Sequence, residues 1–277
     1  MKKILSTLGI FLVSFILYAC HDNSIDDTKT SEKNEEDIRV LLYNIHFGVG
    51  GDGIFNIDRI KDVLENAEAD IIILNEVDKF YSDRSNNMDM AKYLADELGM
   101  NHLFRASIII ENSPNPEREV GNAILTKSTI EHLGTRFFSE GDQWPRVITK
   151  SKIKLQNGQI VNVAVSHFGL TESGRIKQAN ETLEFLADVD NEPVIFAGDL
   201  NATPESVPLE IISNKYNDAF STRNSFYTFP ANNPTKRIDY IFGNEKIIFK
   251  NNAHTILTQA SDHLPIVVDF TIKKSNK

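Results

Sequence analysis

Short apolar runs alternate with helical stripes from residue 38 to residue 273, a pattern that predicts a mixed α/β domain. The run at 71–74 is continuously apolar, as in strands that are buried on both faces. Apolar residues at 57, 60, 63, 64 and 67 instead form one stripe at helical spacing. The whole pattern predicts helices at 57–67, 88–98 and 172–188, and strands at 39–43, 71–74, 102–110, 121–126, 147–155, 160–166, 193–197, 237–242 and 265–272.

No internal repeat and no linker composition interrupts residues 38–273, so we expect this region to be one domain. The chain of 277 residues is long enough to bury a full core. The expected fold class is α/β (α+β), with two packed mixed β-sheets flanked by helices.

The first twenty residues, MKKILSTLGIFLVSFILYAC, combine two lysines, an apolar segment and a small residue before Cys20. This is the order of a secretory signal, and the apolar segment is short for a membrane span. The last four letters resemble a bacterial lipobox, although Tyr18 stands where a small residue is usual. We expect a lipoprotein signal peptide at 1–19 and lipidation of Cys20; an uncleaved N-terminal anchor is the alternative.

Residues 20–37 are acidic and carry Ile25 as their one large apolar side chain, which predicts a disordered tether. The domain is therefore expected outside the cytoplasm, lipid-anchored at the periplasmic face or cell surface of a bacterial outer membrane. Because Cys20 is the one cysteine, the chain has no internal disulfide. The net charge of -10 argues against a broad nucleic-acid-binding face, and we expect a monomer.

Polar residues follow or interrupt six of the predicted elements, mostly where a strand gives way to a loop. Open α/β sheets gather their sites at strand ends, so these loops are expected to share one mouth. The residues concerned are Asn44, Glu76, His167, Asp199, Asn201, Asp239, Asp262 and His263.

Each of these residues alone has a simpler structural explanation. Asp199 and Asn201 fit an Asx turn, Glu76 alone would be a solvated loop acid, and His167 alone would be a structural histidine. Asp239 is harder to dismiss, because a buried acid in a strand needs a partner. Together they supply hard oxygen ligands, few imidazoles and no cysteine, an inventory that suits Mg²⁺ with Mn²⁺ as a substitute.

Seven motifs follow one another along the chain: YNIHFG (43–48), LNEVD (74–78), GNAIL (121–125), SHFGL (166–170), GDLNATP (198–204), RIDYIF (237–242) and SDHLPIVVD (261–269). In this order they resemble the endonuclease/exonuclease/phosphatase superfamily, which includes pancreatic deoxyribonuclease, neutral sphingomyelinases and inositol-polyphosphate 5-phosphatases. The pair GDLN and SDHLP carries most of the specificity. The small bacterial secreted phosphoesterase-like branch looks most similar.

The resemblance implies a four-layered α/β sandwich and metal-assisted hydrolysis of a phosphoester. It makes Glu76 the principal Mg²⁺ ligand with Asn44 beside it, and Asp262 a ligand or a neighbour of the metal.

The same resemblance implies roles around the phosphate. Asp199 would orient or deprotonate the attacking water, and Asn201 would hold a phosphate oxygen. His263 would contact the phosphate, with Asp239 fixing its tautomer, and His167 would be a candidate general acid.

Arginines are the expected ligands of a substrate phosphate, because the planar guanidinium fits phosphate oxygens. Arg84 and Arg146 rank above Arg175 and Arg237, and a surface salt bridge is the alternative for each. The motif at 121–125 adds Asn122 as a substrate contact. An acid–glutamine pair is expected after the first arginine loop, but Asp89 is followed by Met90.

The sequence therefore predicts a membrane-anchored, Mg²⁺-dependent phosphoesterase acting on a phosphomonoester or phosphodiester. The expected substrate is a phosphorylated small molecule, such as a sugar or inositol phosphate, or a lipid head group. A secreted nuclease on the same fold is the alternative, although no Lys/Arg-rich run supports it. A protein that binds a phosphate ligand without catalysis is a third hypothesis.

Overall fold

A computed structural model describes residues 37–110, 117–140, 142–221 and 226–273. The described residues all belong to one compact unit of the chain. The predicted signal peptide at 1–19, the lipidated Cys20 and nearly all of the tether at 20–37 lie outside the described residues. Within the described part of the chain, no helix is long and apolar enough to span a membrane.

One β-sheet, called the first sheet below, contains both the first and the last long strands of the unit. Its order is β11-β13-β1-β2-β4-β3, with β12 paired to β13. β1 and β2 are parallel, and the remaining pairs are antiparallel. The strands are β1 (Ile38–Asn44), β2 (Ile71–Lys79), β3 (Asn101–Ile110), β4 (Arg118–Thr126), β11 (Ile247–Phe249), β12 (His254–Thr255) and β13 (Ile266–Ile272).

The second sheet has the order β5-β6-β7-β8-β10-β9. β7 and β8 are its parallel pair, and β10 runs antiparallel to β8. Each sheet thus has one parallel pair in its middle. The strands are β5 (Thr129–Phe137), β6 (Val147–Lys154), β7 (Ile160–His167), β8 (Val194–Asp199), β9 (Asn217–Asp218) and β10 (Asp239–Gly243).

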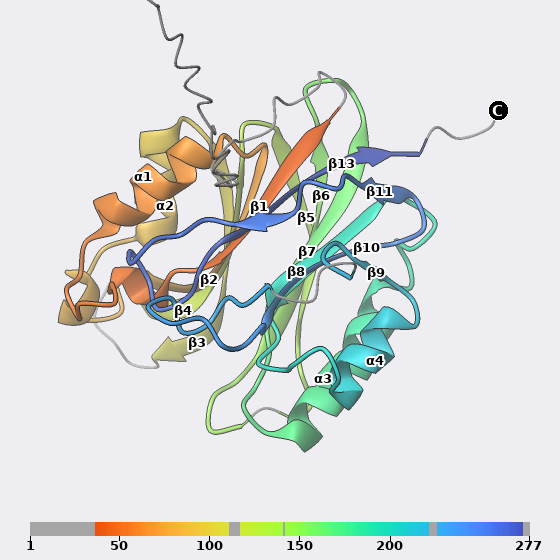
Figure 1. The fold of residues 1–277 in the computed structure, drawn as a ribbon. Helices are drawn as coiled ribbons and strands as arrows, with labels where there is room; N and C mark the ends of the chain where they lie inside the picture. Colours follow the sequence, from red (N-terminus) through yellow and green to blue (C-terminus); the bar gives the residue numbers. More distant parts are fainter. Residues whose placement is uncertain (1–36, 111–116, 141, 222–225, 274–277) are drawn as a thin grey trace, which may run out of the picture. The chain divides into compact units, whose positions relative to one another are not determined.

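The two sheets pack face to face, and helices cover their outer faces (Figure 1). Side chains such as Val40 and Ile73 meet Val163 and Ile195 in the apolar layer between the sheets. On the first sheet lie α1 (Ile57–Ala67) and α2 (Met90–Leu98). On the second lie α3 (Glu172–Leu186) and α4 (Val207–Ser213). This is the four-layered α/β sandwich that the sequence predicts.

Local chemistry explains where the predicted helices begin and end. The Asn56 side chain accepts hydrogen bonds from two backbone N–H groups in the first turn of α1. Asp89 caps α2 in the same way, and Gly99 ends that helix in the left-handed conformation. Met90, which stands where a glutamine is expected from the resemblance, is the first residue of α2 and is fully buried. In this chain the acid at position 89 therefore caps a helix, and residue 90 packs in the apolar core.

Two longer elements, β5 and α4, have no counterpart among the predicted elements. β5 lies at the edge of its sheet, and its side chains are partly or fully exposed, so it lacks an apolar run. α4 is a short helix with a proline in its first turn, too brief to show a helical stripe. Backbone pairing with β6 holds β5, and the burial of Leu209 and Ile212 holds α4, so neither element depends on a local pattern.

A buried ion pair joins β1 and β13, which are neighbours in the first sheet although they come from opposite ends of the chain. The Arg39 Nε donates to Asp269 Oδ1 at 2.7 Å and a second guanidinium nitrogen donates to Oδ2 at 3.1 Å, with both side chains almost fully buried. Arg39→Ala should lower the free energy of unfolding by about 3–5 kcal/mol, because it leaves a buried carboxylate without its cation.

Urea denaturation of purified protein measures this loss. The control is Arg59→Ala, which breaks the equally bidentate but exposed pair with Asp52 and should cost far less. Equal losses in the two variants would show that the Arg39 pair does not stabilise the sheet.

Candidate active site

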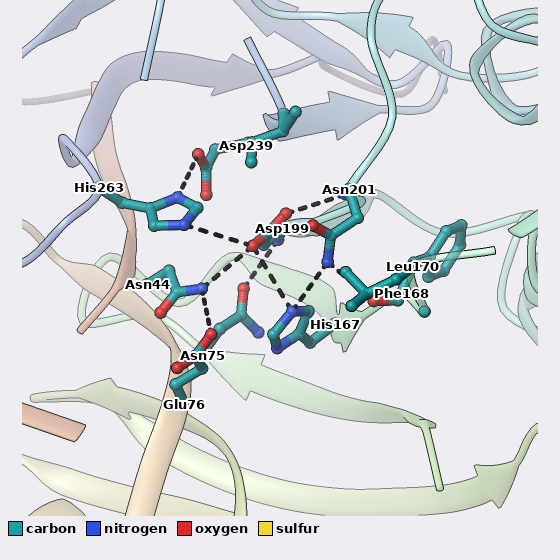
Figure 2. A network of polar contacts seen from close by, with 12 residues as sticks. Asn44, Asn75, Glu76, His167, Phe168, Leu170, Asp199, Asn201, Asp239 and His263 are labelled. Carbon is teal, nitrogen blue, oxygen red and sulfur yellow. Dashed lines mark hydrogen bonds and ion pairs between the residues drawn. The ribbon is translucent and has the colours of Figure 1, made fainter. Parts of the chain in front are cut away.

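The ends of the two parallel strand pairs meet at one edge of the sandwich, where the sequence predicts a shared mouth. Asn44 and Asn75 are paired neighbours in β1 and β2, and His167 and Asp199 are paired neighbours in β7 and β8. Figure 2 shows these residues converging from both sheets. Since the carboxyl ends of parallel strands lie at the same edge, two facing sheets with such pairs create one polar site.

A bulge in β2 gives Glu76 its orientation. The pairing of β2 with β4 shifts between Leu74 and Val77, so the strand carries extra residues at this point. Glu76 itself has a φ of 56°, in the left-handed region that a residue with a side chain rarely adopts. Such backbone conformations collect at functional sites, where the surrounding structure enforces them.

Asn75 links the two sheets beneath the site. Its amide nitrogen donates to Asn122 Oδ1 at 2.8 Å in the first sheet and to the Ser166 carbonyl at 3.0 Å in the second. Its amide oxygen accepts from the Asp199 backbone nitrogen at 2.8 Å. Asn75 is fully buried, so these bonds fix the separation of the sheets at the site.

Asp199 Oδ2 is surrounded by nitrogen atoms from three other segments. It accepts from Asn44 Nδ2 at 3.1 Å, and it lies 3.5 Å from His167 Nε2 and 3.7 Å from His263 Nε2. Its other oxygen accepts from the Asn201 backbone nitrogen at 2.9 Å. The carboxylate is 2% exposed, so these donors replace the water it has lost.

Asn44 connects the two carboxylates that the resemblance makes central. Its amide nitrogen also donates to Glu76 Oε1 at 3.0 Å, while its oxygen accepts from the His46 backbone nitrogen. In this arrangement the nitrogen of Asn44, and not the oxygen, faces Glu76. Asn44 therefore bridges Glu76 and Asp199 by donation.

His263 is held between two acids. Its Nδ1 lies 2.9 Å from Asp239 Oδ2, and Asp239 pairs directly opposite Asp199 across β10 and β8. The ring also packs against Phe229, with 4.8 Å between the ring centroids. The Asp239 contact fixes the ring and points its Nε2 at Asp199.

His167 and Asn201 form a second polar pair. Asn201 has a φ of 48°, which asparagine tolerates better than most residues. Its amide nitrogen donates to the Phe168 carbonyl at 3.0 Å and to His167 Nε2 at 3.1 Å. Because that nitrogen is a donor, His167 Nε2 is the acceptor and its proton is on Nδ1.

Burial and neighbouring charges set the protonation states of the acids. Burial raises the pKa of Glu76 despite the bond from Asn44 and the charge of His263. Burial, reinforced by the charge of Asp239, raises the pKa of Asp199 to about 7. A carboxylate with such a pKa is a competent proton acceptor near neutral pH.

The two histidines have opposite character. Burial alone would lower the pKa of His263, but the charges of Asp239, Asp199 and Asp262 outweigh it and raise the pKa to about 10. Burial and the charges of Arg146 and His263 lower the pKa of His167 well below its usual value. His263 is thus an imidazolium, while His167 is a neutral ring. This favours a role for His167 in holding Asn201 over the expected role as general acid.

The donor set fits a divalent cation at Glu76. Glu76 and Asp262 both line the cleft, so both can bring carboxylate oxygens to a cation there. Asp262 is half-exposed, and its Oδ1 lies 3.7 Å from His46 Nδ1. Asp199, Asp239 and His263 also bring ligand atoms within 4.8 Å of one another, but there both carboxylates already have His263 as a partner. Carboxylate oxygens around Glu76 suit Mg²⁺ or Mn²⁺.

A cleft of about 410 Å³ opens above these groups. Glu76, Asp199 and His263 lie in its wall, and so do the predicted substrate contacts Arg84, Arg146 and Asn122. Another cleft, of about 480 Å³, lies beside the start of β1 and contains none of the predicted site residues.

The four candidate arginines have different surroundings. Arg84 makes a bidentate ion pair with buried Asp78, and Arg237 makes a short ion pair with Asp218 outside the cleft. Arg175 donates to the backbone carbonyls of residues 169 and 170. Arg146 lies 3.6 Å from Asp142, and its buried Nε has no hydrogen-bond partner among the described residues. Arg175 Nε also lacks a partner among the described residues, but of these two only Arg146 lines the cleft, so Arg146 has the most capacity left for a substrate phosphate.

Sequence reasoning did not single out Asn75 or Phe229 as site residues. Asn75 directly precedes Glu76 in the motif at 74–78, and an amide at the end of an apolar strand was its one local signal. Phe229 comes from a loop that only the fold brings against His263.

Asn75→Ala should destabilise the protein by about 1–3 kcal/mol, because it removes both inter-sheet donations and leaves the Asp199 backbone N–H without its acceptor. Thermal denaturation measures the loss. Asn66→Ala, which removes an exposed side-chain bond on α1, is the matched control. A loss no larger than that of the control would contradict a linking role for Asn75.

Comparisons with known proteins agree with this geometry. An uncharacterized protein from Escherichia coli strain K12, YbhP, is 27% identical over 248 residues, which cover 84% of this chain and 95% of its own. The structure of an endonuclease/exonuclease/phosphatase from Bacteroides vulgatus matches with a TM-score of 0.67 and 20% identity, over 86% of this chain and 99% of that one. A mannosyl-6-phosphatase from Bacteroides thetaiotaomicron matches with a TM-score of 0.64 and 17% identity, over 85% and 100%.

The two structural likenesses show a shared fold. The model of the Endonuclease/Exonuclease/phosphatase family matches residues 41–263, which include all the predicted site residues of the cleft, from Asn44 to His263. The chain therefore belongs to the endonuclease/exonuclease/phosphatase family, whose members are metal-dependent hydrolases of phosphoester bonds.

Proposed function

We propose that this protein is a Mg²⁺-dependent phosphoesterase that cleaves a phosphomonoester or phosphodiester of a small molecule or lipid head group. One observation carries the proposal: Asp199 Oδ2 accepts a hydrogen bond from Asn44 and lies 3.5 Å and 3.7 Å from two histidines, beside Glu76, in the wall of one cleft. A proton acceptor, a cationic donor and an acidic ligand set are the parts that hydrolysis by water requires.

The chain's own residues supply both proton transfer and charge stabilisation. Asp199 Oδ2 would take a proton from the attacking water as the water oxygen bonds to phosphorus and the bond to the leaving oxygen breaks. The leaving oxygen would then take a proton from solvent water. The His263 imidazolium, oriented by Asp239, would donate to a phosphate oxygen and offset its charge. Arg146 would hold another phosphate oxygen with its guanidinium.

Glu76 would hold the metal, with Asp262 as a ligand or a neighbour. The cation would supply a Lewis acid that neutralises charge on the phosphate. Asn44, with its nitrogen toward Glu76, would keep the metal-bound carboxylate and Asp199 apart.

The size and charge of the molecule support a small substrate over a nucleic acid. The net charge is -10, and the sequence contains no run of basic residues that could follow a polyanion. A structurally similar protein carries the name mannosyl-6-phosphatase, and that name supports a phosphorylated sugar as one candidate. We propose that the protein acts as a monomer.

Glu76→Gln and His263→Ala test the site. The assay compares bis-p-nitrophenyl phosphate, a panel of phospholipid head groups and plasmid DNA, with full-length protein in detergent and with Mg²⁺ or Mn²⁺. Each variant should lose at least about 100-fold in kcat, and chelation by EDTA should remove the wild-type activity.

Arg175→Lys, outside the cleft, is the control and should keep near-normal turnover. Near-normal activity of His263→Ala would overturn the site. Rapid nicking of plasmid DNA would instead favour the nuclease, and inactivity with both metals would favour a binding protein.

We further propose that the enzyme is an extracytoplasmic lipoprotein held at a bacterial outer membrane by acylated Cys20. The basic, apolar and small-residue order of residues 1–20 supports this location. Cys20→Ser should move the protein from the membrane fraction to the soluble fraction and abolish labelling by a fatty-acid analogue. Ser24→Ala, in the predicted tether, is the control. Continued membrane attachment of Cys20→Ser would favour the uncleaved anchor.

A further inference from the structure

One wall of the active-site cleft is a stack of alternating aromatic rings and guanidinium groups. The Arg84 guanidinium carbon lies 3.5 Å from the Phe47 ring centroid and 4.2 Å from that of Tyr81. The Arg118 guanidinium carbon then lies 5.5 Å from the Tyr81 ring, and its Nε donates to the Tyr81 carbonyl. Phe47, Tyr81 and Arg84 all line the cleft.

Arg84 is fixed within this stack rather than free to hold a phosphate. Its Nε and one terminal nitrogen donate to the two oxygens of Asp78, at 2.9 and 2.7 Å. Asp78 is fully buried and also accepts from Ser85 Oγ at 2.7 Å. Because it is paired with a buried carboxylate and lies against two aromatic rings, Arg84 is suited to position Phe47 and Tyr81.

Trp144 lines the same cleft from a different loop. Its indole is 44% exposed, although large aromatic rings are usually more buried. The loop is held by Asp142, which accepts from the Trp144 backbone nitrogen at 2.9 Å and from the Leu170 backbone nitrogen at 2.7 Å. An exposed ring on a braced loop is available to a ligand at little cost in conformational freedom.

The rest of the cleft lining indicates what kind of ligand these rings would meet. Aromatic faces are electron-rich and pack against the C–H face of a saturated ring. Gln143, Asn122 and Ser107 also line the cleft and offer hydrogen-bonding groups that suit hydroxyls. A ring with an apolar face and a rim of hydroxyls matches this combination. Sugars and inositols share that chemistry.

We propose that Tyr81 and Trp144 form a subsite for the leaving group of the substrate, that this leaving group is a cyclic polyol, and that Arg84 is the positioning residue for Tyr81. The inference rests on the proposed phosphoester hydrolysis in the same cleft. It narrows the substrate from any small phosphoester to a sugar phosphate or an inositol phosphate.

Substrate discrimination tests the subsite. Full-length enzyme is assayed for kcat and KM on glucose 6-phosphate, myo-inositol 1-phosphate and glycerol 3-phosphate, which carries an open-chain polyol. The ratio of kcat/KM for each cyclic substrate to that for glycerol 3-phosphate should fall about tenfold in Tyr81→Ala and in Trp144→Ala. Comparing the two cyclic substrates distinguishes a sugar from an inositol.

The positioning role of Arg84 has its own readout. Arg84→Lys keeps the charge but loses the bidentate pair and the stacking, so it should lower the same ratio. Adding Arg84→Lys to Tyr81→Ala should cause no further fall, because both changes remove one interaction. Arg59→Lys, in an exposed bidentate pair with Asp52, should act independently of Tyr81→Ala and leave the ratio unchanged.

The controls separate the ways in which the proposal can fail. Tyr227→Ala removes an aromatic side chain that is 44% exposed, as Trp144 is, but lies outside the cleft, so this change should leave the ratio unchanged. If Tyr81→Ala folds poorly, Tyr81→Leu takes its place, because leucine keeps apolar volume at this position. A wild-type enzyme that is active but whose ratio survives Tyr81→Leu and Trp144→Ala overturns the subsite. Inactivity of the wild type on all three substrates and on bis-p-nitrophenyl phosphate overturns the proposed function itself.

Discussion

The buried carboxylate of Asp199 is the constraint around which the site is organised. A carboxylate removed from water is costly unless nearby donors replace its hydration. Asn44 and the Asn201 backbone nitrogen donate to it, while the His263 imidazolium lies close by. Burial still leaves the pKa of Asp199 raised to about 7, which suits a proton acceptor. The feature that costs stability is thus the one that gives the group its chemistry.

The two-sheet architecture brings the groups around Asp199 together at one edge of the sandwich. Each sheet has a parallel pair in its middle, and the carboxyl ends of both pairs meet at one edge. Asn75 then joins the sheets through the Ser166 carbonyl and the Asp199 backbone nitrogen. The bulge that follows it turns Glu76 toward Asn44. Structural linkage and catalytic placement therefore share adjacent residues in β2.

Contacts of Arg84 connect the loops in the cleft wall. Asp78, two residues beyond Glu76, pairs with Arg84, and Arg84 packs on Phe47 from the loop that follows Asn44. The loops after β1 and β2 are thereby tied together at the cleft. We infer that the aromatic–arginine stack keeps those loops in place while it presents Tyr81 to a substrate.

The sequence by itself determined most of the longer elements, the family and the residues that gather at the strand ends. Apolar periodicity and capping residues such as Asn56 and Gly99 are local, so they could be recognised without the fold. The edge strand β5 and short α4 could not, because contacts with other elements stabilise them. Only the tertiary structure decided that Asn75 bridges the sheets, that His167 is neutral while His263 is charged, and that Arg84 belongs to Asp78. These properties depend on burial and on partners that are far apart in the chain, and the local sequence around a residue shows neither its burial nor its partners.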